Sequence, residues 1–155
     1  MLFRTHVTVA ILAFFAINHF LEIPSKISFF AIMLLGTIFV DIDSRKSKAG
    51  NRWFLRPFQF FTKHRGVIHS AAACILISLI IASCSRWAGI AFFAGYAVHL
   101  ALDMLTKDGI KLFWPFKIKF KGPIKSGGIP EDIIFVLTLL ADIALAAKTI
   151  FNYLL

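Results

Sequence analysis

Residues 87–105 read WAGIAFFAGYAVHLALDML, an apolar stretch with two polar residues, His99 and Asp103, near its C-terminal end. A helix needs roughly 20 residues to cross the hydrocarbon core of a bilayer, and this stretch has that length. His99 and Asp103 are four residues apart, so a helix places them on one face. The stretch therefore predicts a membrane-spanning helix with a polar pair near its C-terminal end.

Other parts of the chain have similar apolar stretches. The chain is 59% hydrophobic, with a mean hydropathy of +0.80. A soluble domain of this size cannot remove that much apolar surface from water. We therefore predict an all-α, polytopic membrane bundle of about five helices, formed by a single domain over residues 1–155. The expected helices are Phe3–Leu21, Ser25–Val40, Val67–Cys84, Trp87–Leu105 and Asp132–Leu155. The second is short for a span, so it is either tilted less, half-embedded or extended through Asp41.

The formal charge of +9 is distributed unevenly along the chain. If the helices alternate in direction, the N-terminus and the loops at residues 43–66 and 106–131 lie on one side. Of the 17 lysines and arginines, all lie on that side except Lys26, Arg86 and Lys148. The positive-inside rule places that side in the cytoplasm. We therefore predict a multi-pass protein of the inner (cytoplasmic) membrane with a cytoplasmic N-terminus.

The basic loops have two interpretations. They either set the topology and contact anionic lipid headgroups, or they bind a phosphate-bearing substrate. Nucleic acid is not expected as a partner, because the cations lie against a membrane and not on a soluble face. Arg4 is the only early charge, and no small-residue cleavage site follows the first apolar run, so we expect no cleavable signal peptide.

Most of the histidines and several aspartates occur at the ends of predicted helices. In an antiparallel bundle, the start of the first helix, the end of the second, the start of the third and the end of the fourth meet on one side. That side is the one assigned to the cytoplasm. The residues that converge there are His6, Asp41, Asp43, His64, His69, His99 and Asp103.

Three carboxylates brought together at helix C-termini repel one another and the negative ends of the helix dipoles. A divalent cation removes both problems, and His with Asp is a ligand set suited to zinc, manganese or iron. Each residue alone has a simpler explanation: His6 as an interfacial residue, Asp41 and Asp43 as turn residues, and His99 with Asp103 as a local hydrogen bond. The convergence of all of them favours a metal site.

Other polar residues give weaker signals. His19 lies at the far end of the first helix and is interpreted as interfacial. Asp142 lies nearly three turns beyond Glu131, too deep for ligation, and is expected to pair with another helix. Glu131 and Asp132 suit the start of the last helix as caps, and Glu131 is an alternative additional ligand. Phe113, Trp114 and Phe116 resemble an interfacial aromatic anchor.

The motifs resemble a known family in order and spacing. They are Thr5-His6, Asp41-Ile42-Asp43, the run His64-Arg65-Gly66-Val67-Ile68-His69-Ser70, Gly95-Tyr96-Ala97-Val98-His99 continuing to Asp103, and Gly109 to Trp114-Pro115. This is the YdjM-like group, described as LexA-binding, inner-membrane-associated, metal-dependent hydrolases. The resemblance covers nearly the whole chain. Where the family has Pro and His around Asp-x-Asp, this chain has Val40 and Ser44.

The order of His and Asp residues is also similar to the zinc-dependent phospholipase C and S1/P1 nuclease group. That resemblance implies a metal held by Asp41 or Asp43, His64 or His69, His99 and Asp103. It also implies a second metal at His6, bridged by Asp103. One or two ions are expected, zinc first, with manganese or iron as alternatives.

Together these features predict hydrolysis of an ester or phosphoester, such as a phospholipid or lipid-linked phosphate, at the cytoplasmic membrane surface. One of Asp41 and Asp43 would ligate the metal and the other would orient or deprotonate its water, and Arg65 would stabilise developing phosphoryl charge. The alternatives are a metal-ion carrier or sensor, and a metal-binding regulatory or structural membrane protein without catalysis. The sequence leaves open whether the chain forms a homo-oligomer.

Overall fold

Helices make up almost all of the regular structure in a computed structural model of the chain, which describes residues 1–43, Trp53 and residues 66–154. No strand longer than an isolated bridge occurs in these ranges. The five α-helices and one 3₁₀ turn of the described residues confirm the all-α bundle. They are α1 (Phe3–Phe20), α2 (Lys26–Phe39), η1 (Val40–Asp43), α4 (Ala71–Cys84), α5 (Arg86–Met104) and α6 (Ile129–Leu154).

Three of these helices, α1, α5 and α6, are long and apolar enough to cross a membrane. The helix α4 is apolar but shorter. The 3₁₀ turn η1 follows α2 directly. The short helix is therefore extended through Asp41, which is one of the alternatives predicted from the sequence. These features agree with a polytopic helical membrane bundle.

Two helix starts differ from the predicted ones by three residues or more. We expected a helix from Val67, but α4 begins at Ala71 because Ser70 has an extended backbone and its hydroxyl accepts a hydrogen bond from the Ala73 amide. Such a side-chain cap satisfies a free N–H at the start of a helix. The helix α6 begins at Ile129, three residues before the predicted Asp132. Pro130 lies in its first turn, where the missing N–H of proline costs nothing.

The helices α2 and α5 pack closely because a glycine on each helix faces the backbone of the other. A Cβ on Gly95 would lie 1.9 Å from the Met33 carbonyl oxygen, and one on Gly36 would lie 2.4 Å from that of Phe92. Only glycine permits backbones to approach this closely, as small residues do between membrane helices. The Thr37 hydroxyl also donates to the Gly95 carbonyl at 3.1 Å. This contact fixes the C-terminal ends of α2 and α5 relative to each other.

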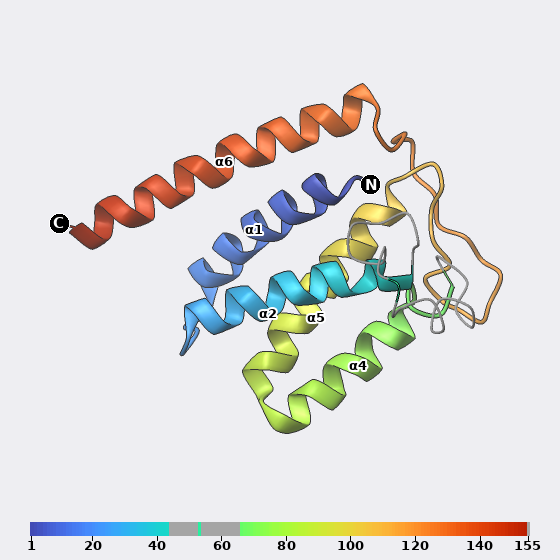
Figure 1. Ribbon diagram of the computed structural model, residues 1–155, viewed down its shortest axis with the longest axis horizontal. Coiled ribbons are helices and arrows are strands. Elements are labelled where there is room, and N and C mark those ends of the chain that lie inside the picture. The colour runs from blue at the N-terminus through green and yellow to red at the C-terminus, as the bar shows by residue number, and fades with distance from the viewer. Residues whose placement is uncertain (44–52, 54–65, 155) are drawn as a thin grey trace.

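One end of the molecule gathers several chain segments (Figure 1). The N-terminus, η1, the start of α4, the end of α5 and the start of α6 all lie there, and we call it the cluster end. The segment of residues 105–128 also lies at this end, held by pairing of Ile110 with Phe120 and by the Ala71 amide donating to the Leu112 carbonyl at 2.8 Å. The helix α6 runs along the outside of the bundle, beside α1.

Candidate metal centre

Six of the seven predicted ligands lie together at the cluster end. The seventh, His64, and the predicted catalytic residue Arg65 lie outside the described residues. Five of the six have less than a tenth of their surface exposed, and Asp41 is half-buried. We call this group the His/Asp cluster; its members are His6, Asp41, Asp43, His69, His99 and Asp103.

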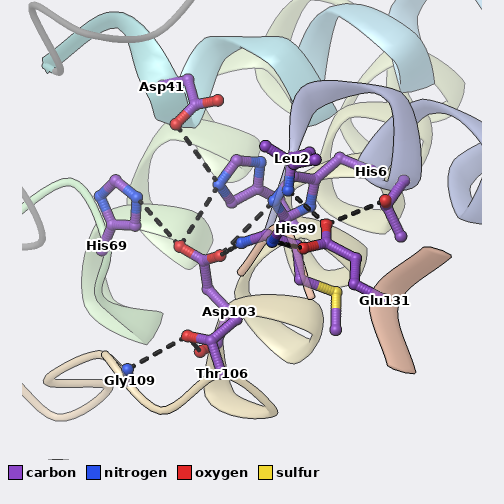
Figure 2. A network of polar contacts seen from close by, with 12 residues as sticks. Leu2, His6, Asp41, His69, His99, Asp103, Thr106, Gly109 and Glu131 are labelled. Atoms are coloured by element: carbon purple, nitrogen blue, oxygen red, sulfur yellow. Dashed lines mark hydrogen bonds and ion pairs between the residues drawn. The ribbon is translucent and has the colours of Figure 1, made fainter. Parts of the chain in front are cut away.

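Asp103 lies at the centre of the cluster (Figure 2). Its Oδ1 lies 2.7 Å from the Met1 amino group and 3.4 Å from His6 Nε2. Its Oδ2 lies 3.6 Å from His69 Nε2 and 3.9 Å from His99 Nε2. Asp103 belongs to the last turns of α5, one turn after His99, so the predicted one-face arrangement brings both side chains into the cluster.

The aspartates of η1 approach the same histidines from the other side. Asp43 Oδ2 lies 3.2 Å from His69 Nδ1, and Asp41 Oδ1 lies 3.9 Å from His99 Nε2. A 3₁₀ turn has about three residues per turn, so the two aspartates leave it in different directions. Asp43 therefore meets His69, whereas Asp41 meets His99.

The orientation of His99 is set by α2. Its Nδ1 lies 2.8 Å from the Thr37 carbonyl oxygen, which accepts only, so Nδ1 carries the proton and donates. The lone pair of the neutral ring is then on Nε2, which faces the carboxylates. The His6 ring stacks on the His99 ring with centroids 4.0 Å apart and planes 2° from parallel. A histidine held in this way at its other nitrogen is the arrangement that metal ligands usually show.

The cluster contains two sets of three donors whose ligand atoms all lie within 4.8 Å of one another. One set is His6, His99 and Asp103, and the other is Asp41, His69 and His99. Both sets use His99, which has one free nitrogen because the other donates to Thr37. His99 can therefore bind only one ion, in one set or in the other. This differs from the two-metal expectation, in which Asp103 was the shared ligand.

The donor chemistry fits a divalent cation. The His99 Nε2 and His6 Nδ1 atoms are buried and have no hydrogen-bond partner among the described residues. Such atoms are costly unless something binds them. Imidazole nitrogens with carboxylate oxygens are typical ligands of zinc, manganese and iron.

Tyr96 and Ser70 position the turn that carries His69, a role that was not predicted from the sequence. The Tyr96 hydroxyl donates to the Ile68 carbonyl, and the Ser70 hydroxyl donates to the Val67 carbonyl at 2.5 Å. Tyr96 is three residues before His99 and so lies on the same side of α5. That spacing is a signal in the sequence that could have identified Tyr96 as a neighbour of the cluster.

Glu131 is fully buried but belongs to neither donor set. It accepts hydrogen bonds from the Leu2 amide, from the Thr5 hydroxyl at 2.9 Å and from the Gly127 amide at 2.6 Å. The alternative that Glu131 is a ligand therefore has no support from these contacts. Its carboxylate instead joins the start of α6 to the start of α1, next to His6.

The remaining polar residues lie outside the cluster. Asp132 forms an exposed pair with Arg4. His19 is exposed near the end of α1. Asp142 is buried in α6, one turn after Thr138, whose hydroxyl donates to that of Thr8 in α1. Neither oxygen of Asp142 has a hydrogen-bond partner among the described residues, so the expected pairing with another helix is not seen there.

The predicted aromatic anchor lies on the segment of residues 105–128. Phe113, Trp114 and Phe116 are all exposed at its turn. Lys111 and Lys117 flank these aromatic side chains and are also exposed. The segment starts two residues after Asp103, so the aromatic residues are carried at the same end of the molecule as the His/Asp cluster.

Comparison with known proteins gives a family match over nearly the whole chain. The model of the family described as YdjM inner membrane protein matches residues 1–154. The "Inner membrane protein YdjM" of Escherichia coli (strain K12) and that of Shigella flexneri are each 33% identical to this chain over 100 residues. That region covers 59% of this chain and 51% of each relative, so the match spans about half the length of these relatives.

No solved structure matches this chain. The more distant likeness to the zinc-dependent phospholipase C and S1/P1 nuclease group stays a prediction. The family model covers α1 to α6 together with the His/Asp cluster. The apolar helices agree with the membrane location that its description gives. The chain therefore belongs to the YdjM inner membrane protein family.

Proposed function

We propose that the chain is a metal-dependent hydrolase that acts on an ester or phosphoester at the membrane surface. The observation that carries this proposal is the convergence of three histidines and three aspartates, almost all buried, of which three histidines and two aspartates form two overlapping donor sets. Burying ionisable groups is costly unless they are paired or coordinate a metal. A metal-dependent hydrolase needs such a set together with access to substrate.

The residues of the cluster divide into two roles. His99 and Asp103 belong to the donor set that includes His6, and both project from the rigid helix α5, so they hold the divalent ion. When bound, a zinc, manganese or iron ion would lower the pKa of a coordinated water toward neutrality. Asp41 is the partly exposed member of the cluster and the one that would accept a proton from that water. Asp43 orients His69 through the 3.2 Å contact.

The number of ions follows from the hydrogen bond between His99 and Thr37. Because Nδ1 is occupied, His99 contributes Nε2 to one ion only. We therefore propose one ion, bound by His99 with His6 and Asp103; the alternative set is His99 with Asp41 and His69. Arg65, outside the described residues, keeps its proposed role of stabilising charge on the phosphoryl oxygens.

The substrate class follows from the location of the site. Helix ends lie near the headgroups of a bilayer, so a phospholipid or a lipid-linked phosphate reaches the cluster without leaving the membrane. The exposed aromatic residues Phe113, Trp114 and Phe116 are carried at the same end and suit the membrane interface. The asymmetric distribution of lysine and arginine supports a cytoplasmic orientation for this end.

A second candidate function is a metal-binding regulatory or structural role without catalysis. The favouring observation is that Asp103 already contacts the Met1 ammonium, His6 and His69, so the cluster forms a connected polar network. In that case substitutions in the basic loops would impair function and those in the cluster would not. Alanine at Asp103, compared with charge reversal at Lys46 and Lys48, separates the two candidates.

Metal content tests the proposal most directly. We expect about one zinc, manganese or iron ion per detergent-purified chain by mass spectrometry. We also expect its loss in both His99→Ala and Asp103→Ala. His19→Ala and Asp132→Ala are matched controls, because each removes the same residue type outside the cluster, and they should keep the ion. The preparation that binds metal is then assayed with phosphodiesters and phospholipids.

A wild-type protein that stays free of metal after reconstitution with zinc, manganese and iron would overturn the metal site and the hydrolase together. Metal binding without turnover of any phosphodiester or phospholipid would favour the second candidate.

A further inference from the structure

A hollow of about 430 Å³ lies between α1 and α6 at the end of the molecule opposite the His/Asp cluster. Toward the middle of the two helices its wall is apolar, formed by Leu12 and Phe15 of α1 and by Leu145 of α6. The hollow is therefore lined at one side by groups that favour hydrocarbon.

Toward the helix ends the wall of the same hollow is mostly polar. Its polar members are Asn18, His19, Lys148, Thr149 and Asn152, and the exposed Phe20 lies among them. At about 1.5 Å per residue, Lys148 lies roughly 28 Å along α6 from Ile129, near the thickness of a hydrocarbon core of about 30 Å. The polar part of the hollow is therefore at the depth of lipid headgroups, and the apolar part is at the depth of acyl chains.

The charge of this wall favours an anion. Lys148 is a cation, His19 is a second nitrogen donor, and no carboxylate among the residues that the structure describes lines the hollow. A neighbouring hollow shares Asn18 and His19 and carries Glu22 and Lys26, which balance each other. Asn18 adds a side-chain amide to this wall.

We infer that this hollow binds a membrane phospholipid. The phosphodiester lies against Lys148 and His19, a headgroup donor reaches Asn18, and the acyl chains begin between Phe15 and Leu145. A lipid fits better than a free phosphate compound, because a soluble ligand would leave the apolar half of the wall without a partner. The site is separate from the His/Asp cluster and goes beyond the proposed hydrolase, since the two occupy opposite ends of the bundle.

Native mass spectrometry of the detergent-purified chain tests this inference. The protein is titrated with phosphatidylglycerol, with phosphatidylethanolamine and, as a soluble arm, with glycerol 3-phosphate. We expect retention of one phospholipid and weak binding of glycerol 3-phosphate. Lys148→Ala should weaken phospholipid binding about fivefold, the loss expected for one lysine near an anionic lipid surface. Ala16→Phe fills the hollow without changing charge and should also reduce retention.

Arg86→Ala is the matched control, because it removes an exposed cation at the same end of the molecule outside the hollow. It should leave lipid binding unchanged, and all three variants should keep the wild-type metal content. Equal lipid retention in wild type, Lys148→Ala and Ala16→Phe would overturn the inference. So would binding of glycerol 3-phosphate as strong as that of the lipids. Neither result bears on the metal site.

Discussion

The helices α5 and α6 both have the length and hydropathy of a membrane span, yet they are held in the molecule in opposite ways. In the most apolar 18-residue stretch of each helix, 50% of α5 is buried inside the protein, compared with 6% of α6. The helix α5 packs on α2 through Gly95 and carries His99 and Asp103, whereas α6 meets α1 through polar contacts such as that of Glu131 with Thr5. Hydropathy identifies both as spans, but burial separates the helix that forms the site from the helix attached beside it.

The largest effect is expected from a substitution that breaks the packing of α5. In Gly95→Leu the first side-chain carbon would lie 1.9 Å from the Met33 carbonyl oxygen, so the two backbones must separate. Overpacking of this kind costs about 3 kcal/mol of stability. Because Thr37 orients His99 across the same contact, bound metal should be lost as well. Thermal unfolding in detergent and metal analysis measure the two effects.

Ala101→Leu is the control for this prediction, because it also enlarges an α5 residue but on an exposed face. It should change neither the melting temperature nor the metal content appreciably. A Gly95→Leu protein that melts like wild type would show that the close approach of α2 and α5 is not needed for stability.

The second largest effect is expected at the attachment of α6. Glu131→Ala leaves the Leu2 amide, the Thr5 hydroxyl and the Gly127 amide without their acceptor. A buried donor left unsatisfied costs roughly 1–3 kcal/mol. The start of α1 should then loosen, and His6 should contribute less to metal binding. Calorimetric titration with zinc, together with thermal unfolding, checks both expectations.

Asp132→Ala is the neighbouring control, because its contact with Arg4 is exposed and such pairs contribute at most about 1 kcal/mol. If Glu131→Ala and Asp132→Ala lose the same small amount of stability, Glu131 is not the attachment point of α6 that its contacts indicate.

The fold was predictable from the sequence because each predicted span corresponds to a run of apolar residues. The convergence of the ligands followed from topology alone: helix ends that alternate across a membrane place His6, Asp43 and His99 on one side without knowledge of any contact. Helix starts were less predictable, because a hydroxyl cap at Ser70 and a proline at residue 130 act within a single turn.

The support of the cluster was not predictable in the same way. The rotation of each helix about its axis determines which carbonyl accepts a hydrogen bond from His99 and which hydroxyl donates to the Ile68 carbonyl. Rotation is set by packing, here by Gly36 and Gly95, and the hydropathy of a span that is apolar on all sides carries little information about it. The sequence therefore indicated the candidate ligands but not Thr37 or Tyr96.

A smaller effect is expected from Tyr96→Phe, which tests whether α5 supports the cluster beyond its own ligands. The variant keeps the ring and removes only the hydroxyl that donates to the Ile68 carbonyl, next to His69. We expect a loss of about 1 kcal/mol in stability, the usual contribution of one hydrogen bond. Metal affinity should weaken if the set containing His69 is used, and it should not change if the ion is held by His6, His99 and Asp103.

The smallest effect is expected within the contact of α6 with α1. Thr138→Val removes the 2.9 Å hydrogen bond between the Thr138 and Thr8 hydroxyls but keeps the shape of the side chain. Hydrogen bonds between membrane helices contribute about 0.6 kcal/mol on average, so the melting temperature should fall slightly and the metal content should not change. Thr149→Val is a matched control, because the Thr149 hydroxyl bonds within its own helix. A loss of metal in Thr138→Val would mean that α6 is coupled to the cluster along its length, and the contrast between α5 and α6 would no longer hold.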